Sequence, residues 1–133
     1  MKASTIKTGF IAAAVMNFAG VLILSRGFTN SAINLLDPVV MSNFGLLMIV
    51  VWGLAFLGAA MIEANLKWLA AAFVVEKLVY VISWWRWFSV DKIALAYELD
   101  MFAGGFYTIY GLNDLIFMLF FAWVFVCQYA DAQ

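Results

Sequence analysis

The stretch AAAFVVEKLVYVISW, residues 70–84, is an apolar run with an acid and a base, Glu76 and Lys77, side by side at its centre. It belongs to the apolar segment 66–85, and one membrane-spanning helix needs roughly 20 such residues. Ionisable side chains at the centre of a bilayer are costly, so they face a protein interior, pair with one another or line a pathway. The stretch therefore predicts a spanning helix whose charges are covered by other helices.

The whole chain has the composition of an integral membrane protein. Of its 133 residues, 68% are hydrophobic and 11% are charged, whereas a soluble domain is about half apolar and about a quarter charged. Four spans of roughly 20 residues would use most of the chain and leave no room for a second domain of roughly 100 residues. We therefore predict an all-α fold, an antiparallel four-helix transmembrane bundle, as a single integral membrane domain over residues 1–133.

Caps and turns set the expected helix boundaries. Asp37 followed by Pro38 is typical of an N-cap and a first helical position, which starts the second span at residue 38. EANLK, residues 63–67, is short enough to force an antiparallel hairpin, and Asp100 is expected to cap a lead-in to the last span. Residues 31–36 and 90–99 predict short interfacial helices in the two longer connections. The predicted spans are residues 8–25, 38–62, 66–85 and 105–127.

The basic residues divide evenly between the two predicted sides of the membrane. The first helix usually dominates orientation, and its Lys2 and Lys7 favour cytoplasmic termini. We expect a multi-pass protein of a bacterial inner membrane with both termini in the cytoplasm. The termini share their side with Lys67, and the opposite side carries Arg26, Arg86 and Lys92.

The charge balance and the lack of the usual metal-binding residues argue against nucleic acid and against metals or haem as partners. The net charge is −1, so no excess of positive charge points to nucleic acid. Histidine is absent, and Cys127 is the only cysteine, which removes the commonest ligands of metals and haem. We expect no metal site and no cofactor.

A polar layer is predicted halfway across the bundle. Glu76 and Lys77 lie about 15 Å from either end of their span at 1.5 Å per residue, and Asp114 and Asn17 occupy similar depths in the fourth and first spans. Inserting Glu76 and Lys77 costs roughly 5–7 kcal/mol, which the apolar residues of that span do not offset. Their helix therefore needs partners, and Asp114 is the expected partner of Lys77.

Several neighbours extend this layer. Tyr80 follows Glu76 by one helical turn, and Asn113 adjoins Asp114. Tyr107 and Tyr110 share a helical face with Asp114, and buried tyrosine hydroxyls usually find a partner. Gly111 opens space one turn before Asp114, where a water, a ligand or a neighbouring helix could approach.

Small residues recur at helical spacing in the first two spans and predict close helix packing within the bundle. In the first span they are Gly9, Ala13 and Gly20, with Asn17 and Val21 on the same face; in the second they are Ala55, Gly58 and Ala59.

Three interpretations of the polar layer remain open: a network that only fixes helix register, a site for a small molecule, ion or proton, or a contact with another membrane subunit. We favour a non-enzymatic subunit or binding protein, surrounded by lipid and partnered by another subunit, a second copy or a small apolar ligand. A transporter or proton-conducting component is the alternative, and an intramembrane acid–base enzyme is third. No residue is assigned a catalytic role.

Once the spans are placed, the chain resembles the small four-helix membrane proteins grouped as DoxX-like. The resemblance rests on chain size, the Gly/Ala-rich segment NFGLLMIVVWGLAFLGAAMIE (residues 43–63), the tight turn after it, and the central acid of WLAAAFVVEKLVY (residues 68–80). Some members of that group are described as membrane subunits of quinone-linked oxidoreductases. The resemblance therefore implies a partner-subunit role and transfers no catalytic residue.

Overall fold

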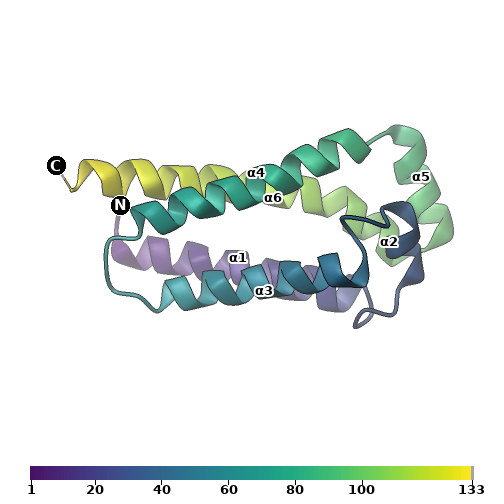
Figure 1. Ribbon diagram of the computed structural model, residues 1–133, viewed down its shortest axis with the longest axis horizontal. Helices are drawn as coiled ribbons and strands as arrows, with labels where there is room; N and C mark the ends of the chain where they lie inside the picture. The colour runs from purple at the N-terminus through teal and green to yellow at the C-terminus, as the bar shows by residue number, and fades with distance from the viewer. Residues whose placement is uncertain (133) are drawn as a thin grey trace.

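Four long helices run side by side and antiparallel in the computed structural model, which describes residues 1–132 (Figure 1). Each of the four is long and apolar enough to cross a membrane, and two short helices close one end of the bundle (Figure 1). The predicted fold class is confirmed, and the chain is a small multi-pass membrane protein embedded in a lipid bilayer. The helices are α1 (Ala3–Leu24), α2 (Ser31–Leu36), α3 (Asn43–Ala60), α4 (Lys67–Trp87), α5 (Val90–Leu99) and α6 (Met101–Ala130).

Three of the predicted spans are present with longer bounds. The first helix begins at Ala3 rather than residue 8, because no helix breaker separates its polar first turns from the apolar run. The last extends from Met101 to Ala130, since Asp100 caps it directly by accepting a hydrogen bond from the Ala103 N–H. The short helices over residues 31–36 and 90–99 have the predicted bounds.

The predicted start of the second span at Pro38 is wrong. The helix begins at Asn43, and its N-cap is Ser42, whose hydroxyl oxygen accepts from the Gly45 N–H at 3.1 Å. Asp37 instead closes a preceding turn, in which its backbone carbonyl accepts from the Met41 N–H. A side chain at Gly45 would meet the Val40 carbonyl oxygen, so the chain folds back over the first helical turn at a place that only glycine permits.

The four spanning helices form two closely packed pairs, α1 with α3 and α4 with α6 (Figure 1). The connection between α3 and α4 makes these helices antiparallel, as predicted, but they are not closest neighbours. Aromatic rings stand between them, with the Phe56 and Phe73 centroids 4.8 Å apart. By contrast, Gly53 of α3 faces Phe18 of α1 at a distance too short for a side chain. The size of the side chains at each contact therefore sets which helices approach.

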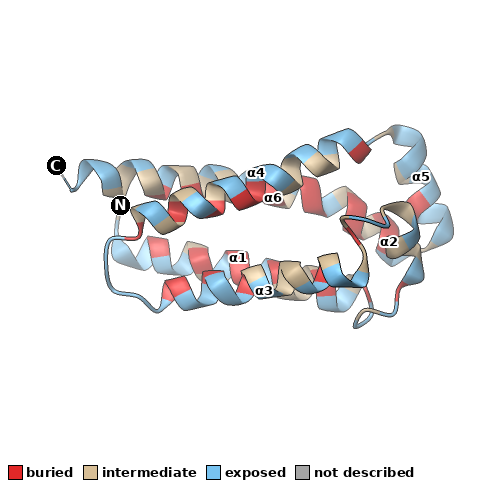
Figure 2. Ribbon diagram, viewed as in Figure 1, coloured by how far each residue is buried: buried red, intermediate tan, exposed pale blue. Residues whose placement is uncertain are grey.

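Burial divides the inside of the bundle from its outside (Figure 2). The inward faces are buried, whereas large apolar side chains such as Val79, Trp85 and Ile116 are exposed on the outside, as expected where lipid replaces water as the solvent. Of the predicted small-residue faces, Ala13 and Ala59 are buried in the bundle. The prediction is wrong for Ala55 and Gly58, which are exposed, because α3 turns these two positions outward.

Two apolar clusters fill the interior, one at each end of the bundle. The cluster near the termini is built on phenylalanines from all four long helices, whose rings meet edge to face or tilted: Phe10, Phe56, Phe73 and Phe121. The cluster near α2 and α5 contains Ile33, Met41, Leu46, Trp87 and Tyr107. Along each long helix, the residues between these clusters lie halfway along the bundle, and the polar side chains gather there.

Candidate functional site

Lys77 is the centre of the polar layer. Its ammonium donates to Asp114 Oδ1 at 2.7 Å and to Asn17 Oδ1 at 3.2 Å. The lysine is only 1% exposed, and these contacts join α4 to α6 and to α1. The charges therefore meet inside the bundle and away from the lipid, and Asp114 is the partner that the sequence predicts.

Asn17 extends the network to the remaining long helix. Its amide donates to the Ile49 carbonyl of α3 at 2.9 Å. The close approach depends on Gly53, one turn further along α3, where an added side chain would lie 3.1 Å from the Asn17 Cβ. Asn113 contributes a second amide, which donates to Asp114 Oδ1 at 3.2 Å. All four spanning helices are thus linked by polar contacts at one level.

Glu76 is the carboxylate that remains without a close partner. Its Oε2 lies 4.0 Å from the Lys77 ammonium and has no hydrogen-bond partner among residues 1–132. The other side of the ammonium faces the Phe56 ring, 5.2 Å from its centroid, a cation–π contact. The layer therefore holds two carboxylates and one ammonium, and the ammonium is bound mainly to Asp114.

The three predicted tyrosines have different environments. Tyr110 is buried, and its hydroxyl has no hydrogen-bond partner in the described part of the chain. Tyr80 is half-buried on α4, one turn from Glu76. Tyr107 does not join the layer, contrary to the prediction, because its hydroxyl donates to the Ile33 carbonyl of α2 at 2.7 Å.

The space beside Gly111 is occupied by a neighbouring helix. A side chain at Gly111 would overlap the indole of Trp84, and that indole N–H donates to the Tyr107 carbonyl at 2.7 Å. The sequence allows a water, a ligand or a neighbouring helix at this position, and in the structure a side chain of the neighbouring helix α4, Trp84, fills it. A small ligand must therefore approach the layer from elsewhere.

Such an approach exists on the opposite face of α6, where a groove runs between α1 and α6. Its cavity volume is about 40 Å³, and Asn17, Asp114, Asn113 and Tyr110 form its polar end. A side chain added at Gly20 would meet nothing within 4 Å, so the groove is open along α1. The remaining wall is apolar and consists of Met16, Val21, Leu24, Ile49, Phe106 and Ile109.

The groove could not be located from sequence alone. Asn17 and Asp114 are visible as polar residues in apolar segments, but Met16, Gly20 and Ile109 resemble any other lipid-facing residues. Their common position depends on the rotation of α1 against α6, which hydropathy does not specify.

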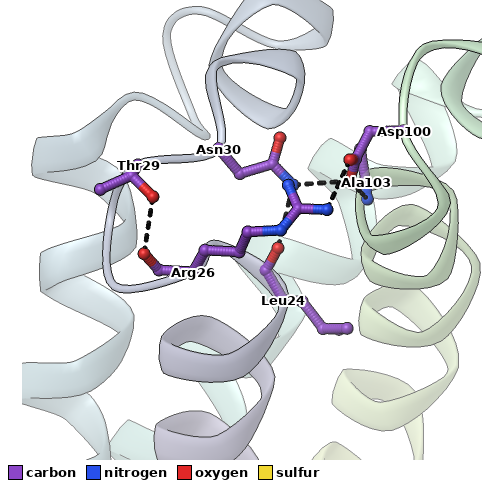
Figure 3. A network of polar contacts seen from close by, with 6 residues as sticks. All are labelled: Leu24, Arg26, Thr29, Asn30, Asp100 and Ala103. Atoms are coloured by element: carbon purple, nitrogen blue, oxygen red, sulfur yellow. Dashed lines mark hydrogen bonds and ion pairs between the residues drawn. The ribbon is translucent and has the colours of Figure 1, made fainter.

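A second polar cluster lies at the surface, at the end of the bundle near α2 and α5 (Figure 3). The Arg26 guanidinium donates to Asp100 Oδ2 at 2.7 Å, and the Asn30 amide donates to Asp100 Oδ1 at 2.9 Å. The hydrogen bond from Arg26, followed by that from the Ala103 N–H, lowers the pKa of Asp100 to about 2. We call Arg26, Asn30 and Asp100 the surface clamp, because they attach the loop after α1 to the start of α6.

The loop held by the surface clamp has an unusual backbone. Arg26, Gly27 and Phe28 have φ angles of 49°, 64° and 67°, the left-handed region, which costs a residue other than glycine roughly 1–2 kcal/mol. Ser25 supports this turn, since its hydroxyl accepts from the Phe28 N–H at 2.9 Å. From the sequence, Arg26 is predicted only to lie on the side of the membrane opposite the termini, and Asp100 only to cap a helix. Nothing local connects two residues so far apart.

The arrangement as a whole supplies hydrogen-bond donors and acceptors within an apolar bundle. Among residues 1–132 no group of three His, Cys, Asp or Glu side chains is placed to hold a metal ion. Comparison of the chain with protein-family models, with curated proteins and with solved structures gave no match.

Proposed function

We propose that this protein is a membrane-embedded binding protein that takes a small lipid-soluble molecule from the bilayer into the groove between α1 and α6. One observation carries the proposal: the buried polar network forms one end of an otherwise apolar, laterally open groove. Binding sites for small molecules are typically apolar with a few converging polar groups. A network that only fixed helix register would not need such access.

The two hydrogen bonds that hold the Lys77 ammonium favour a binding role over acid–base chemistry. Its ammonium is fixed by Asp114 and Asn17, so it orients the carboxylate and amide at the end of the groove. These two side chains in turn present their remaining hydrogen-bonding capacity to an occupant. The network therefore acts as a rigid polar floor.

Photolabelling of the protein in bilayers tests the proposal. A panel of diazirine probes is used that share a decyl tail and end in a methyl, a hydroxyl, a ketone or a sulfate group. At least one probe is expected to label groove residues such as Met16 and Ile109 more than lipid-facing residues outside it, such as Leu54. Mass spectrometry of the labelled peptides gives the ratio.

Two glycine substitutions, one inside the groove and one outside it, provide a variant and its matched control. Gly20→Leu fills the groove, whereas Gly58→Leu adds the same side chain on α3; neither position has a heavy atom within 4 Å of the added Cβ. Both replace glycine in a helix by a better helix former, so both should fold. Gly20→Leu should abolish the excess labelling and Gly58→Leu should not. Labelling that is uniform for every probe would refute the proposal.

A proton-conducting or transporting role is a second candidate, and Glu76 is the observation that favours it. Its Oε2 is buried and has no hydrogen-bond partner in the described chain, and intramembrane carboxylates are typical of proton relays. Proton flux into vesicles containing the protein tests this role. Loss of flux in Glu76→Gln but not in Glu63→Gln would support it, and equal flux in both would exclude Glu76 as the carrier.

We also propose a family for this protein, a membrane and an orientation in that membrane. Its four spans and central acid support placing it with the DoxX-like proteins of bacterial inner membranes, where a partner subunit would be expected. Both termini and the connection between α3 and α4 lie at one end (Figure 1), and Lys2 and Lys7 favour that end as cytoplasmic. In a Cys127→Ser background, an impermeant thiol reagent should label Asp91→Cys from outside, but Glu63→Cys only after permeabilisation.

A further inference from the structure

We infer, building on the proposed binding function, that the ligand is an uncharged lipid-soluble alcohol, whose hydroxyl accepts a hydrogen bond from Tyr110 and donates one to Asp114. The inference rests on the size of the cavity, the charges around it, the free hydrogen-bonding groups at its polar end and its depth in the bundle.

The cavity limits the size of the polar group. Its volume is about 40 Å³, and a water-sized group needs at least roughly 10–15 Å³. The whole groove therefore has room for only a few heavy atoms. Its polar end accepts a group as small as a hydroxyl or a carbonyl, and a longer chain would extend through the lateral opening into the lipid. A phosphate with its ester substituents is too large.

The surrounding charges select against ionised ligands. An anion in the groove would lie beside the carboxylate of Asp114, and Glu76 is the second carboxylate of the layer. A cation would compete with Lys77, which is already 2.7 Å from that carboxylate. An uncharged ligand avoids both repulsions.

The free hydrogen-bonding groups select a hydroxyl. Tyr110 has a buried hydroxyl that donates to nothing in the described chain, and such a group costs free energy unless a ligand or water satisfies it. Asp114 Oδ1 accepts from Lys77 and Asn113, whereas no hydrogen bond to Oδ2 is found within residues 1–132. Tyr110 and Asp114 both line the groove; Tyr110 has an unused donor just below the groove surface, and Asp114 has an unused acceptor. A hydroxyl satisfies both, a ketone satisfies only the donor, and a hydrocarbon satisfies neither.

The depth of the polar end in the bilayer favours a small polar group over the headgroup of a membrane lipid. The polar end lies at the level of Lys77, ten residues from either end of α4, or about 15 Å along the helix. The apolar end reaches Leu24 and Phe106, toward the membrane surface. A phospholipid would have to withdraw its charged headgroup from the interface to fit, which costs far more than withdrawing the single hydroxyl of an alcohol.

Competition among the photoprobes tests the inference. The decanol probe is bound to the wild-type protein in phosphatidylcholine bilayers and displaced by unlabelled decanol, 2-decanone, decane or decyl sulfate at equal mole fraction in the bilayer. Decanol should compete best, followed by 2-decanone and then decane, and decyl sulfate should not compete. Equal competition by decane and decanol, or strongest competition by decyl sulfate, would overturn the inference and leave the proposed binding function standing.

Tyr110→Phe sharpens the test. The substitution should weaken decanol binding about two- to tenfold, the range of one hydrogen bond, and leave decane binding unchanged. Because the hydroxyl has no partner in the unliganded protein, the variant should fold with undiminished stability. Tyr129→Phe, at an exposed position of the same helix, is the control and should change neither. An equal loss for decanol and decane in Tyr110→Phe would contradict the assigned hydrogen bond. Labelling of the groove by none of the four probes would instead remove the proposed function itself.

Discussion

Two ion pairs in this protein have the same bond length and opposite surroundings. Lys77 and Asp114 are 2.7 Å apart at the middle of the bundle, with side chains 2% and 9% exposed. Arg26 and Asp100 are also 2.7 Å apart, at the end of the bundle, with side chains 48% and 18% exposed. Bond length alone would rank the two as equal.

The surroundings determine what each pair does. Water can replace either partner of the surface clamp, so breaking that pair costs little. Neither partner of the central pair can turn to water, so removing one charge leaves the other buried and unpaired. The central pair therefore fixes the register of the helices, whereas the surface clamp only restrains a loop. Substitutions that remove one charge at a time test this difference.

The largest effect is expected for Lys77→Met. The variant leaves two carboxylates, Asp114 and Glu76, in the interior without a cation, and should lose about 3–5 kcal/mol of unfolding free energy. The loss is measured by titrating the protein in detergent micelles with dodecyl sulfate and following helix content. Lys92→Met, at an exposed position of α5, is the control and should change stability little.

Removing both charges of the central pair should restore most of that loss. The double variant Lys77→Met, Asp114→Leu, made in a Glu76→Gln background, leaves no carboxylate without its cation, and replacing a buried ion pair by apolar residues is often neutral or stabilising. If the effects of the two single variants simply add, Lys77 and Asp114 do not act as a pair, and the central network does not fix the register of the helices.

A smaller effect is expected for Asn17→Leu. This variant keeps a similar side-chain volume but removes the second acceptor of the Lys77 ammonium and the link to Ile49 of α3. The expected loss is about 1–3 kcal/mol, the cost of leaving a buried polar group without a partner. Asn113→Leu, whose half-buried amide makes one contact at 3.2 Å, should lose less. A larger loss for Asn113 would contradict the central position of Asn17.

Hydropathy and the positions of a few charges were enough to predict the bundle and the pairing of Lys77 with Asp114. Apolar segments long enough to span a bilayer have few alternatives to a helix. A lysine at mid-span must find an acceptor inside the protein, and Asp114 was the candidate at the same depth on another helix. These predictions succeed because the cost of burying charge in lipid leaves few arrangements.

Other features depended on side-chain fit, which the sequence does not display. Asp37 and Pro38 have the residues of a helix start, but Gly45 lets the chain fold back and moves the start to Ser42. The hydroxyl of Tyr107 donates to a backbone carbonyl of α2, and the indole of Trp84 fills the space at Gly111. Each outcome was decided by a neighbour from a distant part of the chain.

The smallest effect is expected for the surface clamp, and it should depend on pH. Because the pKa of Asp100 is lowered to about 2 in the folded protein from an ordinary 3.8, its carboxylate contributes stability above about pH 4, and this contribution disappears as the pH falls toward 2. Asp100→Asn keeps a side chain that can cap α6 and removes only the charge. It should lose up to about 1 kcal/mol at pH 7 and much less at pH 2. Micelle titrations at both pH values measure this, with Glu63→Gln in an exposed connection as the control. A loss that is the same at both pH values would show that the charge of Asp100 does not contribute, and would contradict a stabilising ion pair with Arg26.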